Sequence, residues 1–281
     1  MAADVPAHSP YALSSPPGWI LYVSHHETVR RLVVFVHGFN GKAVTTWNSF
    51  PESGVYRRWW MESDMLFIGY PSTKDTVTGV SHRLRNTLAR FFPIPYPDAM
   101  VVDGISVRSD TESPYEELVL VGHSLGGLII RRALCDAAIA WDMEGRSGPR
   151  PALLDAQIRL FSPASAGFQA AGVLGALRAM TIWQVVEVFL RRSPAYSELQ
   201  PGSTSLLETR ARTERLAGQS GFDALRAHIV WASPDEVVVS ERYSTDHVDD
   251  AWDGTTHSSV CKPRFGKFEN PWLFAETGRA R

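Results

Sequence analysis

Residues 118–134 read LVLVGHSLGGLIIRRAL, and the rest of the fold can be worked out from this stretch. It opens with an apolar run at 118–121 that is typical of a buried strand, and from residue 125 it continues as an apolar helical pattern. Between the two, Gly122-His123-Ser124-Leu125-Gly126 matches G-x-S-x-G, which marks a nucleophile elbow when a strand precedes it and a helix follows. Glycine at 122 and 126 lets strand and helix approach closely. We therefore predict that Ser124 is a nucleophile held above the sheet edge, rather than an ordinary serine in a glycine-rich turn.

Short apolar runs alternate with helical patterns on both sides of this stretch. Four further runs read as buried strands, at residues 32–36, 65–68, 158–161 and 229–232. Apolar residues at spacings of three or four predict an amphipathic helix, and these are Val77, Val80, Leu84, Leu88 and Phe91. This alternation predicts an α/β fold with a mostly parallel central sheet and helices on both faces.

The chain is expected to consist of an arm, one domain and a tail. Residues 1–18 hold four prolines and predict a flexible N-terminal arm, residues 19–275 a single domain, and residues 276–281 a C-terminal tail. Residues 93–114 read as a long loop. The connection after the fourth strand is unusually long, so a helical cap is predicted at about 165–225.

The predicted cap contains a strongly apolar stretch, AAGVLGALRAMTIWQVVEVFL at 170–190. Arg178 and Glu187 interrupt it, which argues against a membrane-spanning helix. We favour helices whose apolar faces pack on the core. The alternative is a lid whose apolar face meets lipid or acyl chains, giving peripheral contact with a membrane.

Composition narrows the function classes. The chain has 281 residues and a formal net charge of −2, which argues against nucleic-acid binding. Its two cysteines, Cys135 and Cys261, form no CxxC pair, so neither a disulfide scaffold nor a cysteine-based zinc site is expected. We expect no cofactor and no metal. The N-terminus lacks a secretion signal, from which we expect a cytoplasmic protein.

A serine nucleophile requires a base and an acid, which should follow it in the order Ser, Asp, His. The loop after the fifth predicted strand offers Asp235, with Glu236 as the alternative acid. His257 lies on a later loop among small and turn-forming residues, and it is the preferred base. His228 comes too early in the chain, and His247 lies among aspartates that indicate a solvated surface.

The oxyanion hole requires two backbone N–H groups aimed at the developing negative charge. Leu125, directly after the nucleophile, supplies one, and Phe39 in the loop FVHGFNG after the first strong strand supplies the other. His37, Gly38 and His123 are expected to support this geometry by packing or hydrogen bonding.

The chain resembles an α/β-hydrolase. Within that superfamily it resembles the lipase-like branch that contains the GPI-inositol deacylases and the serine-active-site-containing proteins. The matching pieces are HGFNG at 37–41 with Thr46-Trp47, LFIGYPS at 66–72, GHSLGG at 122–127, SELQPGS at 197–203, Asp235 with Val237-Val238, and His257 followed by Cys261-Lys262-Pro263. Relatives often carry T-P-H-x-G after the fourth strand, where this chain has SPASAG at 162–167, and this changes the expected pocket shape.

Residues and resemblance together predict a serine hydrolase that cleaves carboxylic esters through Ser124, His257 and Asp235. The resemblance implies an acyl or lipid-like substrate. One alternative is an acyltransferase that uses the same three residues. Another is a non-catalytic effector domain, or one whose activity a protein partner controls, because a fold does not guarantee a function.

Overall fold

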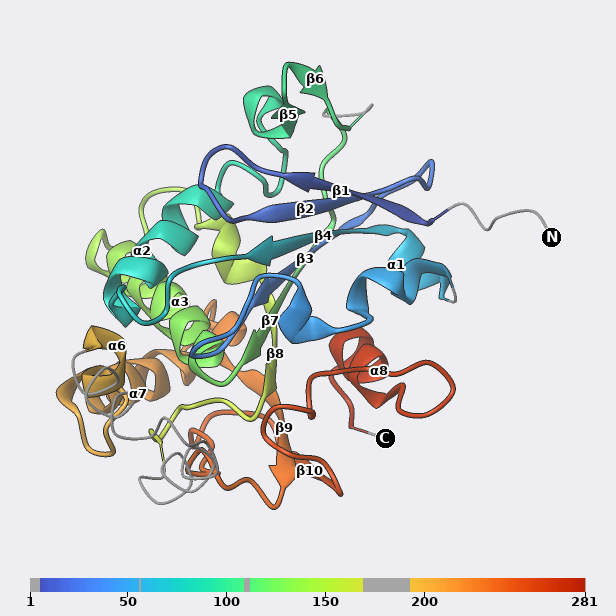
Figure 1. The fold of residues 1–281 in the computed structure, drawn as a ribbon. Coiled ribbons are helices and arrows are strands. Elements are labelled where there is room, and N and C mark those ends of the chain that lie inside the picture. The colour runs from blue at the N-terminus through green and yellow to red at the C-terminus, as the bar shows by residue number, and fades with distance from the viewer. Residues whose placement is uncertain (1–5, 56, 109–111, 169–192, 281) are drawn as a thin grey trace.

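The computed structural model describes residues 6–55, 57–108, 112–168 and 193–280, and its centre is one eight-stranded sheet (Figure 1). The strands, in sheet order, are β1 (His8–Ala12), β2 (Ile20–Ser24), β4 (Ser63–Ile68), β3 (Arg31–Val36), β7 (Glu117–His123), β8 (Gln157–Phe161), β9 (Ala227–Ser233) and β10 (Asp250–Asp253). Strand β2 pairs antiparallel with both β1 and β4, and every other pair in the sheet is parallel. The predicted mostly parallel sheet is confirmed.

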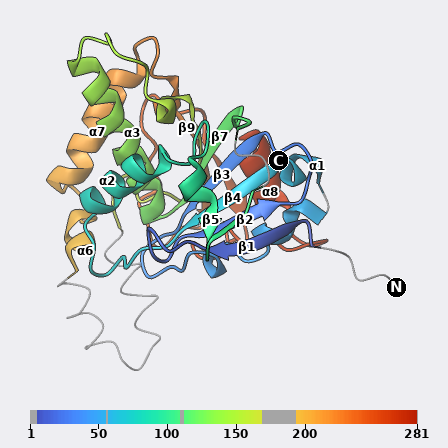
Figure 2. The same cartoon turned by 90° about the horizontal axis from the view of Figure 1, so that it is seen from above.

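Helices cover both faces of the sheet (Figure 2). On one side lie α2 (Val77–Leu88), α3 (Leu125–Met143) and α7 (Thr204–Ala217), and on the other lie α1 (Arg58–Met61) and α8 (Asn270–Thr277). The remaining elements are α6 (Pro194–Glu198), the hairpin strands β5 (Val101–Val102) and β6 (Ile105–Ser106), and five short 3₁₀ turns, η1 (Thr45–Trp47), η2 (Phe50–Val55), η3 (Pro97–Met100), η4 (Ala152–Asp155) and η5 (Asp223–Leu225).

Alternating side chains of each central strand supply two separate cores. In β3, Val34 and Val36 face the core under α2 and α3, whereas Val33 and Phe35 face the core under α1 and α8. The second core is rich in aromatic rings, and Phe35 stacks on Phe67 with centroids 4.5 Å apart. Because both faces are buried, the central strands read as continuous apolar runs.

Three boundaries differ from the sequence predictions. Strand β1 lies inside residues 1–18, so the flexible-arm interpretation is wrong for residues 8–12. Helix α8 extends to Thr277, two residues into the predicted tail. The predicted loop at 93–114 contains η3 and the β5–β6 hairpin.

The predicted cap is described only in part. Helices α6 and α7 lie after β8, but α7 packs beside α3 on the face of the sheet, and the apolar stretch 170–190 falls outside the described residues, so the cap stays a prediction. Within the described ranges, no helix is long and apolar enough to cross a membrane.

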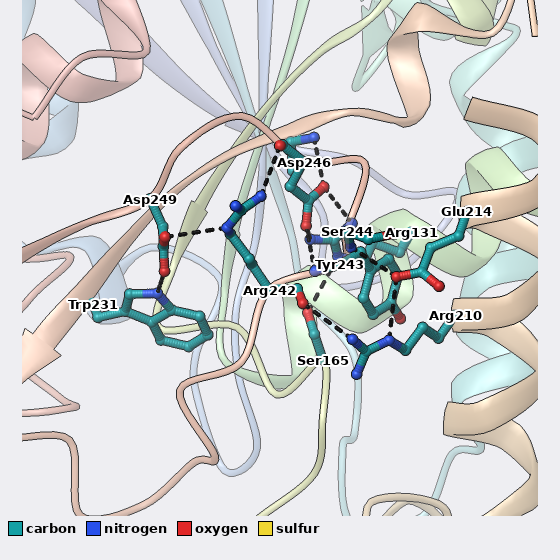
Figure 3. A network of polar contacts seen from close by, with 11 residues as sticks. Arg131, Ser165, Arg210, Glu214, Trp231, Arg242, Tyr243, Ser244, Asp246 and Asp249 are labelled. Carbon is teal, nitrogen blue, oxygen red and sulfur yellow. Dashed lines mark hydrogen bonds and ion pairs between the residues drawn. The ribbon is translucent and has the colours of Figure 1, made fainter. Parts of the chain in front are cut away.

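A buried ion pair fastens α3 to the chain between β9 and β10 (Figure 3). Arg131 Nη1 and Nη2 donate to the two carboxylate oxygens of Asp246 at 3.0 and 2.6 Å, and neither side chain is exposed. Asp246 also accepts from the backbone N–H groups of Ala227 and Tyr243, and Arg131 Nε donates to Ser165 Oγ. The pair is thus satisfied on all sides, which is what makes a buried charge tolerable.

Helix α7 contacts the same loop. Glu214 accepts the backbone N–H of Ser244 at 2.7 Å and pairs with Arg210 at 3.3 Å (Figure 3). The Arg210 guanidinium also lies 5.6 Å from the centre of the Tyr243 ring. These contacts link α7, α3 and the β9–β10 connection.

We expect Asp246→Asn to lower the free energy of unfolding by about 3–5 kcal/mol, because it leaves the Arg131 cation buried without its counter-charge. Denaturant unfolding measures this. The matched control is Asp136→Asn, which breaks a partly exposed i,i+4 pair with Arg132 and should cost no more than about 0.5 kcal/mol. Equal small losses in both variants would contradict the assigned role of the buried pair.

Candidate active site

Ser124 lies at a sharp turn between β7 and α3. Its backbone is at φ 53° and ψ −121°, a conformation that L residues rarely adopt. A Cβ on Gly126 would overlap the carbonyl oxygen of Val36, and a Cβ on Gly122 would lie 2.8 Å from the Gly127 Cα. The predicted reason for both glycines is therefore confirmed. Ser124 itself is 3% exposed, with the loop after β3 packed against it.

Asp235 and His257 meet beside this turn, from loops that follow β9 and β10. His257 Nδ1 lies 3.0 Å from Asp235 Oδ2, and the two side chains are 12% and 0% exposed. The other carboxylate oxygen, Oδ1, accepts the backbone N–H groups of Val237 at 3.0 Å and Val238 at 3.2 Å. Glu236 is exposed, so Asp235 is the acid that the structure brings to the histidine.

Hydrogen bonding keeps Asp235 ionised although it is buried. Burial alone would raise the pKa of this carboxyl group, but the hydrogen bond and charge of His257, the Ser162 hydroxyl and the Val237 N–H together lower the pKa below its usual value. A carboxylate at Oδ2 fixes the proton of the imidazole on Nδ1 and leaves Nε2 as the basic nitrogen.

Nε2 of His257 is thus the ring nitrogen that can accept the proton of Ser124 in the predicted reaction. Within the described residues, no direct hydrogen bond joins it to the Ser124 hydroxyl. Such bonds are often long in a site without substrate and tighten when substrate binds.

His123 holds the backbone of the predicted base. Its Nε2 lies 2.7 Å from the carbonyl oxygen of His257, so Nε2 carries the proton and donates it. The two rings are 4.9 Å apart. Burial and the nearby His257 lower the pKa of His123 to about 3, so this ring is neutral near pH 7.

His37 orders the loop after β3. Its Nδ1–H donates to the Gly38 carbonyl at 2.7 Å, its Nε2 accepts the Tyr70 N–H at 3.4 Å, and its ring stacks on the Tyr70 ring at 4.2 Å. Burial lowers the pKa of His37 to about 4. The ring is neutral and fully engaged, which agrees with the predicted supporting role.

The two predicted oxyanion donors lie on the two segments that meet at Ser124. Leu125 begins α3, and Phe39 follows Gly38, whose Cα would place a Cβ only 2.8 Å from the Ser124 Cβ. Among the described residues, neither the Leu125 N–H nor the Phe39 N–H is donated to another group. Two unused donors next to the predicted nucleophile are the arrangement that an oxyanion hole requires.

Ser162 is a site residue that the sequence analysis did not identify. It follows β8 at φ 41° and is fully buried. Its hydroxyl accepts the Ala232 N–H at 2.9 Å and lies close enough to Asp235 to help lower the pKa of that carboxyl group. Its position in the sequence could have identified it, since Ser162 directly follows a parallel strand and therefore lies at the same sheet edge as Ser124.

The other predicted alternatives lie elsewhere. His228 and His247 stack on each other at 3.9 Å near the amino end of β9, opposite the end where Asp235 follows the strand. In the described part of the chain, no three His, Cys, Asp or Glu side chains are grouped closely enough to hold a metal ion.

Comparison with known proteins gives one family. The model of the alpha/beta hydrolase family matches residues 33–268. Among solved structures, esterase B from Lactobacillus rhamnosis with a tributyrin phosphonate inhibitor is similar at a TM-score of 0.51 and 13% identity, covering 96% of this chain and 84% of that one. Lipase BlEst2 from Bacillus licheniformis gives 0.49 and 17%, covering 86% and 92%.

No curated protein matches the chain in sequence. The family match spans the elbow, the loop after β3, Asp235 and His257. The chain therefore belongs to the alpha/beta hydrolase family.

Proposed function

We propose that this protein is a serine hydrolase that cleaves carboxylic esters through an acyl-enzyme. The observation that carries the proposal is the hydrogen bond between His257 Nδ1 and Asp235 Oδ2 beside the Ser124 turn. A nucleophile, a base and an orienting acid brought together from three separate loops are the parts that this chemistry requires.

The reaction follows from this placement. Ser124 Oγ forms a bond to the ester carbonyl carbon while its proton passes to His257 Nε2. The Leu125 and Phe39 N–H groups stabilise the negative charge on the carbonyl oxygen. The bond to the alcohol then breaks, and His257 returns the proton to the departing oxygen. Water next attacks the acyl-enzyme with His257 again as base, which releases the acid and restores Ser124.

The acyl or lipid-like nature of the substrate is part of the proposal. Phe39 contacts Phe168 edge-on, with ring centroids 6.4 Å apart, and this places apolar surface beside the proposed oxyanion donor. An acyl chain is the ester substituent that gains most from such a surface. The likeness to GPI-inositol deacylases in the quoted motifs favours the same class. Turnover of esters of rising chain length tests it, and equal turnover of acetyl and long-chain esters would contradict it.

The first prediction concerns the nucleophile. We expect a fluorophosphonate probe to label wild type but neither Ser124→Ala nor His257→Ala, because the hydroxyl needs its base. Ester turnover in both variants should fall by several orders of magnitude. Ser258→Ala is the matched control, an exposed serine next to the base, and it should be labelled like wild type. Undiminished labelling of folded Ser124→Ala would overturn the assignment.

The second prediction separates the two candidate acids. Asp235→Asn should lower kcat by about 10⁴, because an amide favours the wrong imidazole tautomer. Glu236→Gln should leave kcat within a few-fold of wild type, since that side chain is exposed. Steady-state kinetics on one activated ester decides between them, and the reverse pattern would assign the acid to Glu236.

The third prediction concerns His123 as a positioning residue. His123→Phe removes the donor to the His257 carbonyl and should lower kcat with little change in KM, because the base loses its fixed position. His123→Gln, which keeps a donor, should recover part of the loss. The pH dependence of kcat/KM should keep its shape near neutrality, since the low pKa of His123 keeps the ring neutral there. A shifted pH profile would instead identify His123 as a titrating group of the reaction.

A further inference from the structure

A pocket lies at the opposite ends of the strands from Ser124. It has a volume of about 320 Å³ and opens at the amino ends of β8 and β9, beside η4 and η5. Its polar lining comes from three arginines, two histidines, one glutamine and two aspartates: Arg150, Arg159, Arg226, His228, His247, Gln157, Asp155 and Asp223. The chain as a whole is slightly acidic, so this gathering of cationic groups is local.

Only one of these arginines has a carboxylate partner in the described part of the chain. Arg150 pairs with Asp155 and also donates to the Leu154 carbonyl. Arg226 donates from Nε and Nη2 to a single acceptor, the Ala217 carbonyl, at 3.1 and 2.9 Å. Arg159 and Arg226 therefore bring two positive charges to the pocket and form no ion pair with a described carboxylate, although Asp223 also lines the pocket.

Arg159 is a buried cation of this pocket and is only 3% exposed. Its Nη1 donates to the Ile158 carbonyl at 3.2 Å and its Nη2 to Gln157 Oε1 at 2.6 Å, whereas its buried Nε has no partner among the described residues. Burial lowers the pKa of Arg159 to about 10, which still leaves the group charged at neutral pH. The Glu117 carboxylate acts to raise the pKa of Arg159, but that carboxylate forms an ion pair with Arg31.

The carboxyl end of α8 compensates the charge only in part. A Cβ on Gly278 would lie 2.9 Å from Arg159 Cζ, so the guanidinium packs directly against the residue that ends this helix. A helix end supplies about half a negative charge, against the full charge of a guanidinium. A buried cation with so little compensation costs stability, and a bound anion would remove that cost.

Two histidines form the adjoining wall. His228 is paired with Arg159 across β8 and β9, and His247 stacks on it. Burial and the Arg159 charge lower the pKa of both rings, to about 4 for His228. Both rings are therefore mainly neutral near pH 7, when each carries one N–H, and the N–H of His228 faces the Gly278 carbonyl.

We propose that this pocket binds a phosphate group, with Arg159 and Arg226 as charged donors and His247 as a neutral donor. A phosphate dianion can pair with the two guanidinium groups that form no ion pair with a described carboxylate, and its oxygens can accept from all three donors. The group can arrive as free phosphate or as a phosphomonoester head group of a lipid. The proposal is independent of the ester chemistry, because the two sites lie at opposite ends of the strands.

The test is a titration of the whole protein with inorganic phosphate. Calorimetry measures the binding, and the midpoint of thermal unfolding measures the stabilisation. We expect saturable binding and a rise of the midpoint with phosphate but not with chloride at equal ionic strength. Arg226→Gln, at a half-buried position, should weaken binding about tenfold or more. The control is Arg30→Gln, an exposed residue of a surface pair with Glu116, which should bind phosphate like wild type.

Arg159→Met separates a binding role from a structural one. If Arg159 is retained for the anion, this variant loses phosphate binding and, without phosphate, unfolds at the same or a higher temperature than wild type. A variant that unfolds earlier or does not fold at all, together with undiminished phosphate binding in Arg226→Gln, overturns the proposal. The proposal is also overturned if phosphate raises the midpoint of thermal unfolding of wild type no more than chloride does and shows no calorimetric binding.

Vesicles distinguish the two sources of the phosphate group. Wild type should sediment with phosphatidylcholine vesicles containing phosphatidic acid, and Arg226→Gln should not, if the ligand is a lipid head group. Binding of free phosphate without sedimentation supports the same pocket with a soluble ligand. Equal sedimentation of wild type and both arginine variants, together with no calorimetric binding, would contradict the pocket.

Discussion

The proposed site depends on the close contact between helix α3 and strand β3 at Gly126. A side chain there would overlap the Val36 carbonyl, so the helix could not begin where it does. That contact fixes the Ser124 turn and brings the Leu125 N–H to the same place as the loop that carries Phe39. The spacing of two parallel strands therefore sets the proposed nucleophile and the Leu125 donor, and the loop that carries Phe39 packs against them.

The acid and the base belong to a different part of the chain and need their own supports. Asp235 is held by Ser162 and by the N–H groups that follow it, and His257 is held by Asp235 through its ring and by His123 through its backbone. His123 therefore joins the two halves, since it precedes the nucleophile and anchors the base. The Arg131–Asp246 pair fastens the connecting chain to α3, the helix that begins at the nucleophile.

The parts of the fold that could be predicted from the sequence are those that a local residue pattern determines. The apolar runs of β3, β4, β7, β8 and β9 are buried on both faces, and the elbow needs glycine at two fixed positions, so both could be recognised. Strand β1 contains Pro10 and lies at the sheet edge, where proline is tolerated and an apolar run is not required. Strand β10 buries only Trp252. The contacts of His123 and Ser162 join residues far apart in sequence, so no local pattern predicts them.

Strand β8 reaches both the proposed ester site and the proposed phosphate pocket, since Gln157 at its amino end lines the pocket and Ser162 follows its carboxyl end. It is nevertheless a poor route for communication between them. The strand is paired on both sides, to β7 and β9, and its side chains are packed into both cores. Close-packed elements of this kind have no second arrangement for a ligand to favour. A phosphate bound near Arg159 would therefore stabilise the folded state as a whole while leaving the geometry around Asp235 unchanged.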